Sequence, residues 1–197
     1  MRTFMPVLAA LLIASPVPTG AQDLPAGDMA AKPFEEEHAE RLDELFRDLK
    51  RERNERAAER ISQRIWREWF RSGSATVDLM MHWSEEATKE KKFDVALDFL
   101  DQAIVLKPGY AEAWNRRATV HFMMDSYSKA MSDIERTLRL EPRHFGALTG
   151  MASILKETGE KELALRAYER VLEVYPMMRA AQEEVGKLAD ELAGDRI

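Results

Sequence analysis

The chain has 197 residues, of which 45% are hydrophobic and 32% charged, and its formal net charge is −6. This composition suits one folded domain of ordinary size and excludes a wholly disordered chain. The acidic balance argues against a nucleic-acid-binding protein. The absence of cysteine excludes disulfides, a thiol nucleophile and cysteine-ligated metals.

Residues 1–21 have the layout of a secretory signal peptide. Arg2 and the amino terminus give a positive start, residues 4–13 are almost wholly apolar, and a run of small residues ends at Ala21. A helix over residues 4–13 would be about 15 Å long, too short for a hydrocarbon core of about 30 Å. We expect cleavage after Ala21 and a bacterial periplasmic location, with secretion to the medium as the lesser option. The alternative is an apolar N-terminus on a cytoplasmic protein.

Residues 22–33 contain Pro25, Gly27 and Pro33 with little to bury, so they are expected to form a flexible leader. Residues 34–76 follow with helical spacing. Apolar residues recur there at intervals of three and four, in two stripes: Leu42, Leu45, Phe46 and Leu49, then Ile61, Ile65, Trp66 and Trp69. Gly73 is placed to end the second stripe. Two helices or one long helix are both compatible with this stretch.

The next hundred residues repeat at a fixed interval. Pro108, Pro142 and Pro176 are each 34 residues from the next. Four further columns keep the same interval: Ser84, Ala118 and Ala152; Ala96, Ala130 and Ala164; Leu97, Met131 and Leu165; and Ile104, Leu138 and Leu172. A fixed period of 34 is typical of helix-turn-helix repeat arrays. It defines three units, at residues 77–110, 111–144 and 145–178.

Each unit is expected to hold two helices. The first ends near a turn at residues 91–92, 125–126 or 158–159, and the second stops before the proline, which disfavours helical geometry in the residue ahead of it. Two positions that lie 34 residues before columns of the first unit fit the pattern: Ser62 is at a small-residue column and Trp66 at a bulky one. The position 34 residues before the first unit's proline holds Ser74. Residues 34–76 are therefore expected to form a degenerate N-terminal repeat or cap. Residues 179–197 are expected to form a capping helix and tail.

These columns resemble the tetratricopeptide repeat (TPR) family. Its pattern is met most fully in the middle unit, by Trp114, Ala118, Tyr127, Ala130, Ile134 and Pro142. The resemblance implies an all-α, right-handed helix-turn-helix solenoid with three clear repeats, one degenerate N-terminal repeat and a C-terminal capping helix. Small residues at two columns let the helices of a unit approach closely. The stretch from Arg117 to Phe145 also resembles small exported repeat proteins of Gram-negative bacteria.

The resemblance also implies a binding groove on the concave face, built from the first helix of each unit. Carried onto this sequence, its residues are Met81, Glu85, Lys89, Asn115, Thr119, Phe122, Met123, Thr149, Ser153 and Lys156. The family's carboxylate clamp uses lysine and asparagine at fixed positions. Here those positions hold Met81 and Glu85 in the first unit, and Gly146 and Gly150 stand where the third unit should be basic. We therefore expect a mixed apolar and polar groove without this clamp.

No pattern in the chain indicates catalysis. Its four histidines, His38, His82, His121 and His144, include no pair at helical metal-binding spacing, and there is no phosphate-binding loop. His121 is expected to be packed. The arginine-rich stretch from residue 41 to 71 carries interleaved acids, which favours a solvated, salt-paired face with buried aromatics. We expect no enzyme activity, no cofactor and no metal.

The leading functional prediction is a non-catalytic periplasmic scaffold or adaptor that binds a protein or peptide partner in its concave groove. One alternative is a structural protein whose exposed array faces stack on copies of itself. Another is a peripheral membrane factor that works through the arginine-rich first helices. The partner's identity and the oligomeric state do not follow from the sequence.

Overall fold

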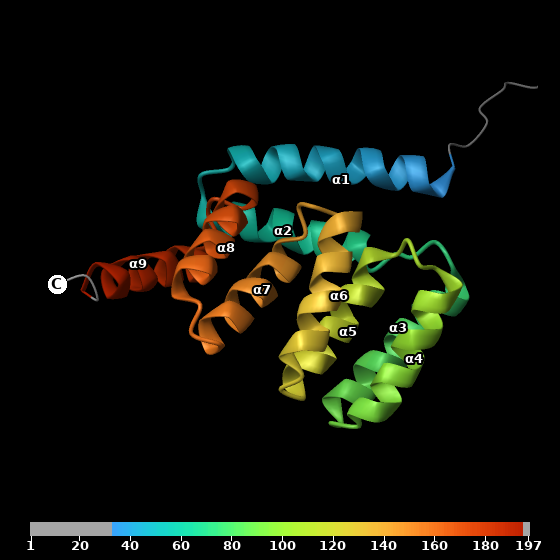
Figure 1. Cartoon of the computed structure of the whole chain (residues 1–197). Helices are drawn as coiled ribbons and strands as arrows, with labels where there is room; N and C mark the ends of the chain where they lie inside the picture. Colours follow the sequence, from blue (N-terminus) through green and yellow to red (C-terminus); the bar gives the residue numbers. More distant parts are fainter. Residues whose placement is uncertain (1–32, 195–197) are drawn as a thin grey trace, which may run out of the picture. The chain divides into compact units, whose positions relative to one another are not determined.

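The computed structural model describes residues 33–194, so the expected signal peptide and nearly all of the expected leader lie outside the described residues. This part of the chain holds nine α-helices and no strand (Figure 1). The helices are α1 (Phe34–Arg51), α2 (Glu55–Trp69), α3 (Ala75–Lys89), α4 (Phe93–Leu106), α5 (Ala111–Met123), α6 (Tyr127–Leu140), α7 (Phe145–Glu157), α8 (Lys161–Val174) and α9 (Arg179–Gly194). The predicted fold class, an all-α helical repeat solenoid, is confirmed.

Helices α3 to α8 form three antiparallel pairs, over residues 75–106, 111–140 and 145–174. The second helix of each pair ends two residues before its proline, at Leu106, Leu140 and Val174. Ala96, Ala130 and Ala164 are each fully buried, with 0% of their surface exposed, where the two helices of a pair meet. Because no room remains beside these alanines, we expect larger side chains to force the helices of a pair apart.

The turn inside each unit uses one backbone geometry. Lys91, Asp125 and Gly159 occupy the same position of the repeat, and all three have positive φ angles of 58°, 53° and 85°. The next amide in each turn donates back to a carbonyl five residues earlier, as in Lys92 to Ala87 at 2.8 Å. This bond satisfies a carbonyl that the end of the first helix would leave unpaired. The turn therefore holds despite the cost of a left-handed conformation in a lysine and an aspartate.

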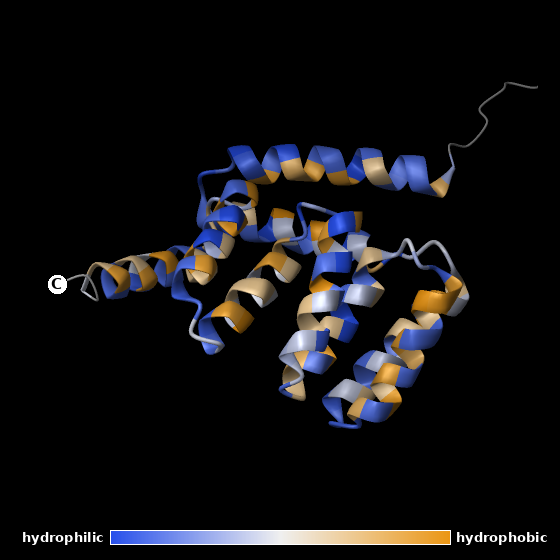
Figure 2. Cartoon of the chain, in the orientation of Figure 1, coloured by the Kyte–Doolittle hydropathy of each residue, from blue (hydrophilic) through white to orange (hydrophobic). Residues whose placement is uncertain are grey.

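Residues 34–69 form two helices, which settles the choice between one and two. The side chain of Asn54 accepts a hydrogen bond from the amide of Ala57 at 2.9 Å and so begins α2. The buried stripes of α1 and α2 share one apolar core with α7, α8 and α9. Figure 2 shows α1 with its hydrophobic residues on one side and hydrophilic residues on the other.

The α1–α2 hairpin does not stack on the first unit, as a preceding repeat unit would. The apolar cluster of the first unit contains residues of α3, α4 and α5, and none of α1 or α2. Long-range contacts decide this placement. The buried Leu49, Ile65 and Trp69 pack with Phe145, Leu148 and Tyr168, some hundred residues further along the chain.

Helix α9 closes the other end of the array. It packs against α8 and buries Ala181 and Leu188. Its outward residues include Glu183, Lys187 and Glu191, which are exposed. Within the described residues, no helix is both long enough and apolar enough to cross a membrane.

Candidate protein-binding groove

The first helices of the three units, α3, α5 and α7, carry two hollows on one face. The first, about 280 Å³, opens between α3, α5 and the end of α2. The second, about 170 Å³, opens between α5 and α7. Together these two hollows are called the groove below. Both lie where the repeat pattern predicted a binding face.

Seven of the ten predicted groove residues line these hollows. Glu85, Lys89 and Asn115 line the first, and Phe122, Thr149 and Ser153 line the second. Thr119 lines both. The structure thus brings these seven side chains together, although their role in binding stays a prediction.

The other three predicted residues lie elsewhere. Met81 is 5% exposed and packs in the apolar cluster of the first unit, because its helix turns this apolar side chain towards α4 and α5. Met123 is 46% exposed at the end of α5, outside both hollows. Lys156 forms an ion pair with Glu184 of α9 at 2.5 Å, which holds its ammonium away from the groove.

Charged groups of the first hollow neutralise one another. Lys89 pairs with Glu85 at 2.9 Å, and Arg116 pairs with Glu85 at 3.2 Å and with Glu112 at 3.1 Å. The hydrogen bond from Lys89 and the nearby charge of Arg116 lower the pKa of Glu85, so it stays ionised at neutral pH. The second hollow has no charged lining residue: its walls are Ala118, Thr119, Phe122, Ile134, Thr149, Gly150, Ser153 and Ile154. The groove therefore offers little attraction to a strongly charged ligand.

Helix α2 and its C-cap residue Phe70 supply a wall of the groove that the repeat pattern did not predict. Trp66 and Phe70 line the first hollow, and the guanidinium of Arg116 lies 4.6 Å from the Phe70 ring centroid. Trp66 also explains the glycine at a position where the family's clamp would need a base. A Cβ atom on Gly146 would lie 2.6 Å from Cη2 of Trp66, so only glycine leaves space for the indole ring. In the sequence, Gly146 at a helical groove position was the one signal that another element packs there.

The stacked side chains of Trp69 and His144 hold the α1–α2 hairpin against the start of α7. The His144 ring stacks on Trp69 with centroids 3.9 Å apart and an interplanar angle of 7°. Its Nδ1 accepts a hydrogen bond from the amide of Ala147 at 3.1 Å and so caps α7. The other nitrogen, Nε2, lies 3.1 Å from Glu112, and therefore donates to that carboxylate. Glu112 is 2% exposed and also accepts from Asn115 and Arg116, so its buried charge is compensated.

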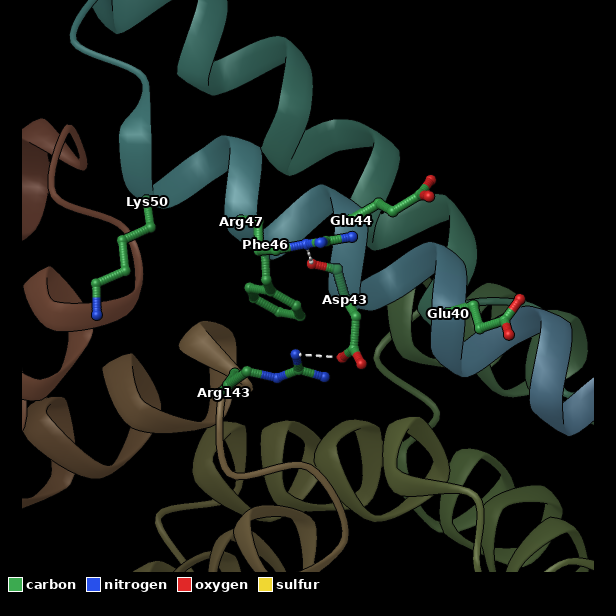
Figure 3. A pocket seen from close by; sticks show the side chains of 7 residues that line it. All are labelled: Glu40, Asp43, Glu44, Phe46, Arg47, Lys50 and Arg143. Carbon is green, nitrogen blue, oxygen red and sulfur yellow. Dashed lines mark hydrogen bonds and ion pairs between the residues drawn. The ribbon is translucent and has the colours of Figure 1, made fainter.

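Helix α1 adds a second attachment on its own side of the array. Arg143, in the turn before α7, donates to Asp43 at 2.7 Å and stacks 4.3 Å from the Phe46 ring centroid (Figure 3). These residues border a hollow of about 690 Å³ whose walls are mostly exposed charged side chains of α1. Another, about 650 Å³, lies along α1 near Lys107 and Tyr110, where Lys107 already contacts the Ser72 carbonyl and Glu35. Both are larger than the groove, but the first lies on α1 and Arg143, and the second reaches the first helices only at Ala111 and Glu112, at the start of α5.

Two arginines of the arginine-rich stretch form ion pairs, so the expected salt-paired face is met in part. Arg41 pairs with Glu37 and Glu68, and Arg71 also pairs with Glu68. Of its four aromatic residues, Phe46 and Trp69 are buried, Trp66 is half-buried and Phe70 is 42% exposed beneath Arg116. The expected burial is therefore fully met by two of the four rings.

No metal site is formed by the side chains of residues 33–194, where no three histidine or acidic groups converge on a point. His121 is half-buried, as predicted, and lies 3.9 Å from Asp133. Burial is the main cause that lowers its pKa, and the positive charge of Arg117 adds to it. His144 is wholly buried and serves as a packing and capping residue.

Comparison with known proteins agrees with this architecture. The tetratricopeptide repeat family model matches residues 145–176. A TPR repeat-containing protein of Rhizobium etli is 57% identical over 157 residues, which cover 80% of this chain and 77% of that protein. The chain therefore belongs to the tetratricopeptide repeat family.

Solved structures show the same fold. The first TPR domain of Spaghetti, bound to the HSP90 peptide SRMEEVD, superposes with a TM-score of 0.58 at 24% identity, over 61% of this chain and 95% of that one. The TPR domain of OM64 from Arabidopsis superposes with a TM-score of 0.56 at 17% identity, over 59% of this chain and 96% of that one. At these identities the likeness concerns the fold.

Proposed function

We propose that this protein is a non-catalytic scaffold that binds an extended segment of a protein partner in the groove, in the bacterial periplasm. The observation that carries the proposal is the second hollow between α5 and α7. It is open, uncharged and lined by Phe122, Ile134 and Ile154 with hydroxyl groups of Thr119, Thr149 and Ser153 beside them. A mostly apolar concavity with a few polar groups is the usual form of a binding site.

The size and chemistry of this hollow suggest its ligand. Cavities of about 150 Å³ lined by apolar side chains accept a benzene ring, and this one measures about 170 Å³. We infer that the partner inserts one aromatic or branched aliphatic side chain between α5 and α7, while its backbone passes the hydroxyl groups. The Spaghetti domain binds a peptide rich in acidic residues. Here Lys89 and Arg116 are already paired with acids, which favours an uncharged segment instead.

Filling the second hollow is expected to weaken binding without harm to the fold. A Cβ atom on Gly150 would lie 3.4 Å from Cδ1 of Ile134, so the larger side chain of Gly150→Leu occupies the hollow. Because the partner then loses the burial of one apolar side chain, its affinity should fall by about 10- to 100-fold. Peptides selected from a random library on the mature chain serve as ligands, and fluorescence anisotropy measures the dissociation constant.

The matched control is Gly186→Leu. Gly186 is also a helical glycine, it is exposed on α9, and a Cβ there meets no atom within 4 Å. Both substitutions replace glycine by a better helix former, so a difference between them reports the hollow. Equal peptide affinity in Gly150→Leu and wild type would contradict the proposed site.

The periplasmic location rests on the charged start, apolar run and small residues of the first 21 positions. In a Gram-negative host, we expect the protein in the osmotic-shock fluid, with Gln22 as its first residue by N-terminal sequencing. Protein that keeps Met1 and remains with the cytoplasmic fraction would contradict this part of the proposal.

A further inference from the structure

The outer side of the first unit carries an exposed apolar surface, called here the end face. Leu79 and Trp83 of α3 are 44% and 45% exposed, and Leu106 of α4 is 55% exposed. The rings of Trp83 and Phe99 touch across the two helices, with centroids 5.3 Å apart. Their spacing in each helix places these residues on one side, so they form a continuous surface.

The repeat itself shows what this surface is built to contact. One period after Leu79 comes Ala113 and then Ala147, which are 0% and 1% exposed. One period after Phe99 comes Asp133 and then Ala167, which are 4% and 3% exposed. In the second and third units these positions are covered. In the first unit Leu79 is 44% exposed and Phe99 is half-buried.

The second unit shows how the corresponding contact is made. Arg117 stands one period after Trp83, and it bridges Asp133 of its own unit and Asp101 of α4 in the preceding unit. The pair Arg117–Asp133 therefore faces the preceding unit. At the same two positions the first unit has Trp83 and Phe99, whose apolar rings contact each other, and Trp83 is 45% exposed. An aromatic pair at a stacking position suits an apolar partner surface.

We propose that the end face is a dimer interface, where two copies of this chain cover each other's first unit. The α1–α2 hairpin, which would cover it as a preceding unit, is committed to α7 and α8 instead. The opposite end of the array is covered by α9 with its charged outer side. Because only one end is open, copies can meet end face to end face and cannot grow into a filament. Two identical apolar surfaces related by a twofold axis are self-complementary.

The size of the surface predicts a reversible association. Two helices of 14 and 15 residues lying side by side present a face of roughly 20 by 20 Å. Two such faces bury roughly 800 Å² in total, which is in the range of weak, transient interfaces. We therefore expect a dimer with a micromolar dissociation constant, formed independently of the groove.

Sedimentation velocity of the mature wild-type chain between about 1 and 200 μM is the test. The sedimentation coefficient should rise from monomer to dimer across this range. Trp83→Glu places a charge in the contact and should raise the dissociation constant about tenfold or more. Leu163→Glu is the control, since Leu163 is exposed to nearly the same extent, 42%, on α8. It should leave the dimer unchanged.

Cross-linking tests the same interface in variants that keep Trp83, so the result does not depend on whether Trp83→Glu folds. The chain contains no cysteine, so Gln102→Cys on the end face and Glu169→Cys on α8 each give one reactive thiol. A short bismaleimide should link two copies through position 102 and leave position 169 unlinked. A wild-type chain that stays monomeric at 200 μM, or equal dimerisation of Trp83→Glu and wild type, would overturn the proposal.

Discussion

Replacing His144 with alanine is expected to lower the free energy of unfolding by about 3–5 kcal/mol. The substitution removes four contacts at once: the stack on Trp69, the edge contact with Trp66, the cap on the Ala147 amide and the hydrogen bond to Glu112. Loss of a buried ring accounts for most of this value, and the carboxylate of Glu112 also loses one of its donors. Chemical unfolding followed by circular dichroism measures the change.

Two further variants separate these contributions. His144→Phe keeps an aromatic ring against Trp69 but removes both nitrogens, so about 1–3 kcal/mol of destabilisation is expected for the unmade hydrogen bonds. His82→Ala removes an exposed histidine and should change stability by no more than about 0.5 kcal/mol. If His144→Ala unfolds at the same denaturant concentration as wild type, the hairpin is not held by this cluster.

Replacing Arg117 with alanine is expected to cost about 2–4 kcal/mol, because it leaves the carboxylate of Asp133 without its main partner. Asp133 is 4% exposed, and Arg117 donates to it twice, at 2.8 and 2.7 Å. These hydrogen bonds raise the pKa of Arg117. The exposed pair of Arg139 and Glu135, 3.8 Å apart, supplies the control: Arg139→Ala should cost less than about 1 kcal/mol.

The cost of Arg117→Ala should depend on pH. In wild type the pKa of His121 is lowered by burial and by Arg117, so the folded state binds this proton less readily than the unfolded chain does. Stability therefore falls as the pH drops below the ordinary histidine value of about 6.5. Without Arg117 the pKa of His121 rises, and the protonated ring can pair with Asp133. Unfolding at pH 7.5 and 5.5 should thus show a smaller difference between variant and wild type at the lower pH. A constant difference would contradict this coupling.

The array was predictable because each unit repeats the same contacts. The alanines at 96, 130 and 164 and the prolines that follow them keep their interval because every pair of helices meets and ends in the same way. The turn positions followed from this register as well. The groove residues Thr119, Phe122, Thr149 and Ser153 could be named for the same reason, since the period fixes which side of each first helix they occupy.

The hairpin's position was not predictable in this way. Trp66 and Trp69 read as an ordinary helical stripe, and their contacts with His144, Phe145 and Gly146 join residues about eighty positions apart. Contacts between residues so far apart leave no periodic pattern in the sequence. Met81 was misassigned to the groove because its position in the repeat is a groove position in other units, whereas here an apolar side chain packs into the unit's own core.

Helix α2 packs against the third unit and also borders the hollow beside the first unit. This placement determines which segments of the chain unfold together. In an open array each unit contacts only its neighbours, and the ends can fray one unit after another. Here the last units share one core with the first helices of the fold, so residues 42–69 and 145–188 gain or lose their order together. The first unit has a separate core, and it is the segment free to open locally while the remainder stays folded.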